Sequence, residues 1–375
     1  MPDVIVVGAG PVGLLLAAEL TRRGVAVDML ERRPEPGAGT RAIGIHAPVL
    51  AALEASGLTD ALLAPALRVG RGEARADGRT LGVVRFDRLS ARFPFVATLP
   101  QAATEAVLAA HAPAPERGAE AVAVHDDPRH ATVRMADGED RVAPIVVVAT
   151  GWTGRPLVYR RVPTHVYPDR YLMADVAVGE RPDADVAVVN LDREGVLESF
   201  PLPGERRRVV AWDFPPADDS DVARAARLAE AVARRGEPEA AAAIVEASAF
   251  GVRRVVAPRL RRGRILVVGD AAHEVSPIGG QGMNLGLLDA ATLAPLLAEW
   301  IRTGAAPEAA LRRWEQRRVR SATTAARLAA VNTALGRPRG PVTGAMRSTA
   351  VRIMLGPLAG AAFASAYAMG LDADG

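Results

Sequence analysis

Two glycine-rich clusters hold most of the residues in this chain that could do chemistry. The first follows an apolar run at residues 4–7 and precedes an apolar segment with helical spacing; it reads Gly8-Ala9-Gly10-Pro11-Val12-Gly13. In such a turn the first glycine permits a tight bend, the second lets a phosphate approach the backbone, and the third lets helix and strand pack closely. The free N–H groups at the helix start then suit the pyrophosphate of a dinucleotide.

An acidic residue stands where a dinucleotide-binding turn needs one. A second predicted strand, residues 25–31, ends at Glu31, whose carboxylate can accept hydrogen bonds from both hydroxyls of a ribose. Arg32 follows it and is included among the candidate cofactor-binding residues. Strand, glycine turn, helix, strand and acid in this order indicate a dinucleotide-binding unit, and a merely structural glycine turn is the weaker interpretation. This motif does not separate FAD from NAD.

The second glycine-rich cluster lies far downstream and favours FAD. After the apolar run 265–268 come Gly269 and Asp270, then Pro277, and then a turn that opens another apolar helix and reads Gly279-Gly280-Gln281-Gly282-Met283-Asn284. Asp270, at a strand end, can accept a hydrogen bond from a polyol hydroxyl. The N–H groups of residues 280–284 converge at a helix N-terminus, whose partial positive charge stabilises a reduced, anionic flavin. A capped helix start would explain Asp270 but not the glycines, Gln281 and Asn284.

Taken together, these motifs resemble those of the p-hydroxybenzoate hydroxylase-like group A FAD-dependent monooxygenases, and the likeness covers residues 3–320. By this resemblance Asp270 binds the ribityl chain, and the flavin is lined by Gly280, Gln281, Gly282, Met283 and Asn284. Arg41 and Gln101 match further FAD contacts, and Pro277 matches the proline beside the reactive flavin face. The segment Trp314-Glu315-Gln316-Arg317-Arg318 resembles the tail helix of the family.

The resemblance implies an oxygen-transfer activity. NADPH or NADH would reduce the FAD, O2 would form a C4a-hydroperoxyflavin, and one oxygen atom would hydroxylate or epoxidise an aromatic or polyketide-like small molecule. The cofactor then performs the difficult step, while the protein supplies orientation and exclusion of water, so no protein nucleophile is expected. Two alternatives stay open: a flavin oxidoreductase without oxygen insertion, such as an oxidase or double-bond reductase, and a non-catalytic FAD-binding accessory protein.

One motif departs from the family. Where the family has Asp-Gly after a strand near residue 149, this chain has Thr150 and Gly151, which we retain as candidate cofactor contacts. Threonine can form a hydrogen bond but has no charge. We therefore expect NAD(P)H to reduce this flavin slowly.

Candidates for contact with the substrate come from isolated polar and aromatic residues. His46 and Tyr171 are candidate bases or donors for a phenolic substrate, as are His165 and Tyr167, and Pro277 completes the candidate catalytic set. Each His or Tyr has a structural role as its commoner alternative. Three aromatic residues of the predicted sheet could form the substrate wall or equally belong to a plain core: Phe200, Trp212 and Phe214.

The helices and strands expected to position these residues indicate an α/β protein. Its expected parts are a Rossmann-like FAD-binding domain, an inserted, mostly antiparallel β-sheet substrate domain and a helical C-terminal region. We expect helices at 11–23, 48–56, 101–111 and 221–248, strands at 120–124, 132–135 and 144–148 returning to the first sheet, and successive strands over 165–214. The expected domains are 1–160 and 256–320 (FAD), 161–255 (substrate) and 321–375 (C-terminal helices).

Composition limits the other function classes. The 375 residues carry a net charge of only +3, and every basic residue except histidine is a scattered arginine, which argues against nucleic-acid binding. Cysteine is absent from the sequence, so disulfides and thiolate sites are excluded, and no metal site is expected. Residues 353–370 are uncharged but rich in Ala and Gly, which favours a packed helix over a membrane span. We expect a cytoplasmic monomer or homodimer.

Overall fold

A computed structural model describes residues 1–37, 42–214, 218–357 and 359–372. Its nucleotide side is a six-stranded sheet in the order β18-β19-β12-β1-β2-β8. The central strands are parallel and their apolar residues are buried, as expected for strands covered on both faces. The strands of this sheet are β1 (Val4–Val7), β2 (Val27–Glu31), β8 (Glu116–Arg117), β12 (Ile145–Val148), β18 (Arg261–Arg262) and β19 (Ile265–Val267).

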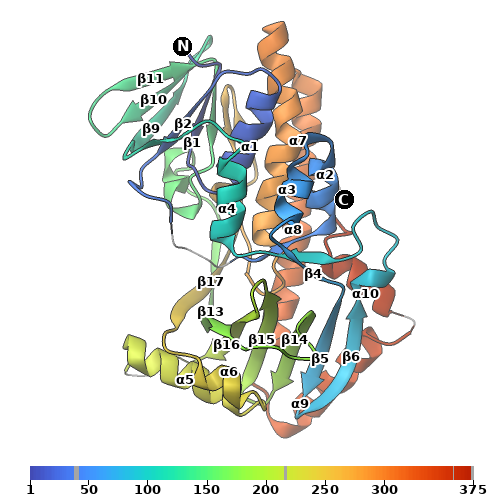
Figure 1. Cartoon of the computed structure of the whole chain (residues 1–375). Helices are drawn as coiled ribbons and strands as arrows, with labels where there is room; N and C mark the ends of the chain where they lie inside the picture. Colours follow the sequence, from blue (N-terminus) through green and yellow to red (C-terminus); the bar gives the residue numbers. More distant parts are fainter. Residues whose placement is uncertain (38–41, 215–217, 358, 373–375) are drawn as a thin grey trace.

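A second, eight-stranded sheet lies below the first in Figure 1, in the order β20-β17-β13-β16-β15-β14-β5-β6. Its strands pair antiparallel except for β14 with β5. Strands from outside residues 161–255 join both edges, so this sheet is larger than the expected insertion. Its strands are β5 (Arg71–Ala76), β6 (Arg79–Arg85), β13 (Thr164–Ala177), β14 (Val186–Asp192), β15 (Gly195–Leu202), β16 (Arg206–Asp213), β17 (Ser248–Val256) and β20 (His273–Glu274).

Two local expectations need correction. Only β12 of the strands over 120–148 returns to the first sheet, because the alternating residues of β9 and β10 pair antiparallel with β11 in a sheet of their own. The expected helix at 221–248 is two helices, since Gly236 adopts φ +80 and Pro238 begins the second. The elements are β9 (Ala121–Asp126), β10 (Ala131–Met135), β11 (Asp140–Ala143), α5 (Asp221–Ala233) and α6 (Pro238–Ala242).

The N-terminal helices and one small sheet complete the nucleotide side. Helices α1 and α7 pack against each other beside the parallel sheet, and α1 also packs on α4 (Figure 1). A three-stranded sheet in the order β3-β7-β4 is formed by strands that lie between β2 and β8 along the chain. These elements are α1 (Pro11–Arg22), α2 (Ala47–Leu53), α3 (Leu58–Leu63), α4 (Gln101–Ala109), α7 (Gly282–Thr303), β3 (Gly44–Ile45), β4 (Leu67–Val69) and β7 (Val96–Thr98).

The C-terminal region is helical and connects both sheets. Helix α8 (Glu308–Leu335) has 28 residues, so at the standard rise per residue it is about 42 Å long. It is followed by α9 (Pro341–Met354) and α10 (Gly360–Tyr367), which contact β6. The uncharged stretch at 353–370 is thus split between two helices, and among the described helices none is long and apolar enough to cross a membrane. The expected fold class is confirmed.

Candidate active site

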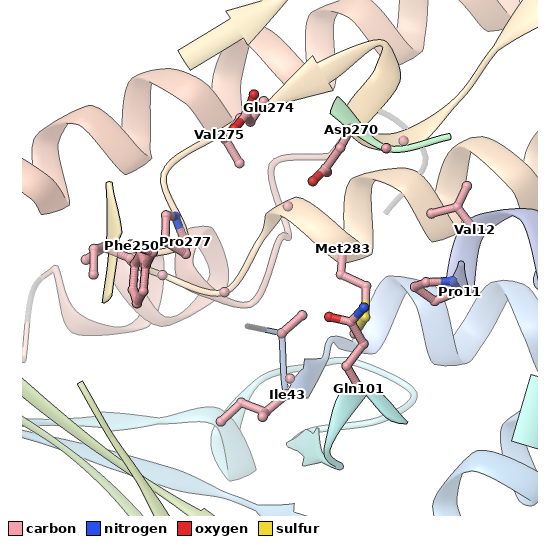
Figure 2. A pocket seen from close by; sticks show the side chains of 18 of the residues that line it. Pro11, Val12, Ile43, Gln101, Phe250, Asp270, Glu274, Val275, Pro277 and Met283 are labelled. Carbon is pink, nitrogen blue, oxygen red and sulfur yellow. The ribbon is translucent and has the colours of Figure 1, made fainter. Parts of the chain in front are cut away.

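A cavity of about 850 Å³ extends from the glycine turn after β1 to one face of the eight-stranded sheet. Figure 2 shows Pro11 and Val12 toward one end of this cavity and Pro277 and Phe250 toward the other. The Asp270 carboxylate points into the space between these ends. The cavity therefore joins the two glycine-rich clusters to the inner face of the second sheet.

The glycines of the first turn have two different roles. Gly8 has φ +109, and a Cβ there would lie 2.5 Å from the Ala149 carbonyl oxygen; a Cβ on Gly13 would lie 2.0 Å from the Gly8 oxygen. A side chain at either position would collide with backbone, so both allow the close strand–helix packing. A Cβ on Gly10 would meet nothing within 4 Å, and Gly10 lines the cavity. Gly10 thus leaves open space at the helix N-terminus.

Glu31 is held in a charged, oriented state beside this turn. Its carboxylate accepts hydrogen bonds from the Ala9 N–H at 2.8 Å and from the Arg33 backbone N–H and Nε at 3.0 Å. Burial opposes ionisation, but these hydrogen bonds outweigh it and keep the pKa of Glu31 below its usual value. Arg32 also lines the cavity and donates to Thr153 Oγ1 at 3.0 Å.

The turn that carries Asp270 is fixed by a buried charge network that the sequence did not reveal. Asp289 of α7 accepts from the Gly269 N–H at 2.9 Å and from Arg318 Nε at 2.8 Å, and it lies 2.6 Å from His273 Nε2. Burial would raise the pKa of Asp289, but His273 and Arg318 outweigh it and the pKa is lowered. This network holds the strand end in place, so Asp270 is presented to the cavity.

The second glycine turn is positioned by two amides that do not line the cavity. Asn284 is fully buried; its Oδ1 accepts from the His46 N–H at 2.8 Å, and its Nδ2 donates to the carbonyls of Gly44 and Gly280 at 2.8 and 3.0 Å. Gln281 Nε2 donates to the Ala366 carbonyl at 3.3 Å. Asn284 therefore joins the turn to β3, and Gln281 joins it to α10.

An arginine connects the Thr150 segment to the Asp270 turn. Arg155 donates to the Asp270 carbonyl at 2.6 Å and to the Glu274 carboxylate at 3.1 Å. Arg253 also donates to Glu274, at 3.2 Å, and its guanidinium lies 4.0 Å from the ring centroid of Trp152. These contacts fix the short 3-10 helix η3 (Trp152–Leu157) that follows Thr150.

The candidate bases occupy different environments. His46 lines the cavity and is only 2% exposed; its Nδ1 has no hydrogen-bond partner among the described residues, and burial lowers its pKa to about 4. Tyr171 lies outside the lining, stacked on Phe250 at 5.6 Å, and burial raises its pKa. Thr150 lines the cavity with a buried Oγ1 that is unpartnered within the described part of the chain. At neutral pH, His46 and Tyr171 are therefore both uncharged.

Most residues predicted from sequence converge on this one cavity. Those that line it are Gly8, Gly10, Pro11, Val12, Glu31, Arg32, His46, Gln101, Thr150, Gly151, Phe200, Gly269, Asp270, Pro277, Gly280, Gly282 and Met283. Those outside the lining are Gly13, Tyr171, Trp212, Phe214, Gln281 and Asn284. Arg41 lies outside the described residues.

Strand β16 lines the cavity only as far as Val210, and neither Trp212 nor Phe214, just past the end of the strand, belongs to the lining. Trp212 donates its Nε1 hydrogen to Asp169 at 3.2 Å, and Asp169 also accepts from Arg337, just beyond α8. Phe214 is 73% exposed at the strand end. The end of α8 thus covers this part of the sheet, and only Phe200 of the three expected wall residues lines the cavity.

The sheet end of the cavity is a mostly apolar chamber. Its floor is the inner face of the sheet, and its other walls come from the C-terminal helices. Apolar chamber residues include Val84, Val189, Val196, Val210, Leu355 and Phe363. Glu198, in the middle of β15, also lines this chamber, and sequence reasoning missed it. A single acid within an apolar strand was the available signal.

The family model described as "FAD binding domain" matches residues 1–329. The chain belongs to this family. It is 36% identical over 329 residues to a 6-methylpretetramide 4-monooxygenase of Streptomyces rimosus, and the match covers 82% of this chain and 57% of that protein. It is also 31% identical to a rifampicin monooxygenase of Rhodococcus hoagii, with coverage of 85% and 68%. The chain therefore spans only about three-fifths of the first relative's length.

Solved structures agree on the fold. The chain superposes on an anhydrotetracycline hydroxylase from Streptomyces rimosus with a TM-score of 0.79 at 28% identity, covering 99% of this chain and 76% of that one. A p-nitrophenol 4-monooxygenase from Pseudomonas putida gives a TM-score of 0.87 at 23% identity, with 98% of both chains covered. The second likeness shows shared architecture along nearly the whole of this chain.

Proposed function

We propose that this protein is an FAD-dependent monooxygenase that uses NAD(P)H and O2 to hydroxylate or epoxidise an aromatic or polyketide-like small molecule. The main support is the continuous cavity, which runs from a dinucleotide-type glycine turn to a chamber lined mostly by apolar side chains. The chain's relatives include proteins named as monooxygenases of 6-methylpretetramide, anhydrotetracycline and rifampicin, which agrees with such a chamber.

The described residues fit an FAD molecule. Gly10 faces open space at the start of α1, and Thr150 Oγ1 and His46 Nδ1 are buried polar atoms without partners in the part that the structure describes. Gly10 would face the pyrophosphate and Glu31 would accept from the adenosine ribose. Asp270 would accept from the ribityl chain, and Gly280, Gly282 and Met283 would face the isoalloxazine ring. When bound, FAD supplies the redox chemistry, taking electrons from NAD(P)H for the activation of O2.

The protein's own contribution is placement and exclusion of water. The apolar chamber would hold an aromatic ring next to the turn that contains Pro277, and the helices α8, α9 and α10 contribute side chains to its lining. The low pKa of His46 leaves its imidazole neutral at pH 7, so this side chain can orient a polar group by hydrogen bonding but adds no positive charge. The donor site for NAD(P)H belongs to the same proposal, and Thr150 in place of an acid predicts slow reduction.

Turnover in the presence of labelled oxygen tests this function. The FAD-loaded protein is incubated with NADPH or NADH and a panel of polyphenolic and polyketide compounds, and both nicotinamide oxidation and product mass are followed. We expect at least one compound to stimulate oxidation and to gain one atom of oxygen-18 from labelled O2. Stimulated oxidation without label in any product indicates the flavin oxidoreductase alternative. No oxidation with any compound, despite bound FAD, contradicts an enzymatic role.

A further inference from the structure

The chamber contains one acid that no described protein group satisfies. Glu198 is 4% exposed and lines the cavity, yet the described residues provide it with neither a hydrogen bond nor an ion pair. Its cross-strand neighbours are Val189 on β14 and Val210 on β16, and both of them also line the cavity. An isolated polar group in an apolar wall is costly to bury unless a ligand bonds to it.

The geometry of β15 directs Glu198 into the chamber. Adjacent residues of a strand point to opposite faces. Leu197 belongs to the apolar cluster that includes α5 and α6, and Ser199 Oγ accepts from Arg207 on the same outer side at 2.7 Å. Glu198, between them, therefore points to the inner face.

Burial keeps the Glu198 carboxyl protonated at neutral pH. It raises the pKa of Glu198 to about 8, so below that pH the group is a neutral acid that can both donate and accept a hydrogen bond. Two tyrosines lie within electrostatic range, Tyr171 on β13 and Tyr367 on α10, and burial raises the pKa of each. Both tyrosines therefore stay neutral in the range where Glu198 titrates.

Other charged groups of the neighbouring strands are already paired. Arg208 on β16 lines the cavity, but its guanidinium is bound to both carboxylate oxygens of Asp175 at 2.6 and 2.7 Å. Glu73 on β5 lines the cavity and pairs with Arg75 at 2.7 Å. Within the described residues, every cation in the chamber around Glu198 already has a counter-charge. The described side chains therefore give the chamber no free positive charge to bind an anionic ligand.

We propose that Glu198 is a substrate-positioning residue that hydrogen bonds a hydroxyl or carbonyl group on a neutral aromatic or polyketide ring, and that the chamber selects against carboxylate-bearing substrates. This inference rests on the proposed function for the identity of the cavity as a substrate site. It specifies the substrate class: an uncharged ring with an oxygen substituent, not an aromatic acid.

Ligand binding by calorimetry tests the proposal without turnover. The probe is 2-acetylnaphthalene, whose ketone only accepts hydrogen bonds and does not ionise; naphthalene and 2-naphthoate are the comparison probes. For the FAD-loaded protein at pH 6.5 we expect Glu198→Leu to weaken ketone binding about 10-fold, as for one buried hydrogen bond. Glu198→Gln keeps a donor of similar shape and should stay within about 3-fold. Naphthalene should bind the Leu variant at least as well as the wild type.

The pH dependence provides a separate test. From pH 6.5 to pH 9 the wild type should lose about 10-fold in ketone affinity, because an acid with a pKa of about 8 becomes mostly ionised and stops donating. The Gln variant should show no such loss. Asp192→Asn is the matched control, since it removes an acid of the same sheet that is paired with Arg235 and lies outside the cavity lining, and it should retain both the wild-type affinity and its pH dependence.

Several outcomes overturn the inference. These are unchanged ketone affinity in Glu198→Leu, equal losses for ketone and naphthalene, a pH effect that persists in Glu198→Gln, tighter binding of 2-naphthoate than of the ketone, or no binding of either neutral probe. Failure of the proposed function looks different. In that case the ketone binds in a Glu198-dependent way, while no compound receives oxygen from O2.

Discussion

At the nucleotide end of the cavity the wall comes mainly from short glycine-rich segments, whereas at the sheet end it comes from strands and helices drawn from much of the chain. Gly8 and Gly10 lie within three residues, but Val84, Glu198 and Leu355 of the chamber are far apart in sequence. Backbone geometry determines the first end, and side chains determine the second. A change at the nucleotide end should therefore affect folding or cofactor retention, and a change in the chamber should affect ligand choice.

The largest effect should come from the first glycine turn. Gly8→Ala combines φ +109 with a Cβ 2.5 Å from the Ala149 oxygen, so we expect a loss of about 3 kcal/mol or more in the free energy of unfolding. Gly10→Ala is the control, with φ −81 and open space around the new Cβ. It should change the apoprotein stability by less than about 0.5 kcal/mol while weakening FAD binding. Urea denaturation of both apoproteins measures the difference; equal stabilities would contradict it.

An intermediate effect should separate two polar residues at the nucleotide end. Asp270→Ala removes a charged acceptor that points into the cavity, so we expect FAD affinity to fall by about 10- to 100-fold. Thr150→Ala removes a neutral hydroxyl, and its effect should stay below about 3-fold. Titration of each apoprotein with FAD, followed by flavin fluorescence, gives both constants. Similar losses in the two variants would show that Asp270 does not serve as the main ribityl acceptor.

The smallest effect should distinguish true chamber residues from nearby aromatics. Phe200→Ala removes a ring from the cavity wall and so enlarges the cavity. It should weaken the binding of an aromatic ligand by about 10-fold, through lost apolar contact. Phe214→Ala, at an exposed strand end, should leave ligand affinity and stability nearly unchanged. Calorimetry with 2-acetylnaphthalene compares the two. A larger loss for Phe214 would mean that the chamber extends further along β16 than its present lining.

The same contrast explains what the sequence could predict. The turn from Gly8 to Gly13 and the Gly269-Asp270 strand end are local patterns, so the α/β fold and the FAD family could be recognised from them. The Asp289–Arg318 pair and the position of Glu198 depend on contacts between distant segments. No local spacing encodes those contacts.

Two misplaced aromatics show the same limit. Trp212 and Phe214 have the alternation of a wall strand, and Val210 of the same strand does line the chamber. The environment of Trp212 depends on where α8 ends, near Arg337, which hydrogen bonds Asp169 beside Trp212. Helix length and packing angle are tertiary properties that the strand's own sequence does not contain.

Helix α8 has a consequence for how the molecule loses its structure. Near its middle, Arg318 is buried between Asp289 of the nucleotide side and Asp372, and just past its end Arg337 pairs with Asp169 of the lower sheet. Unfolding this helix would take Arg318 away from the buried Asp289 on the nucleotide side and would expose Trp212 on the lower sheet. Neither large sheet can unfold completely while α8 stays folded against the other sheet. The two sheets should therefore denature in one cooperative calorimetric transition, as a single thermodynamic unit.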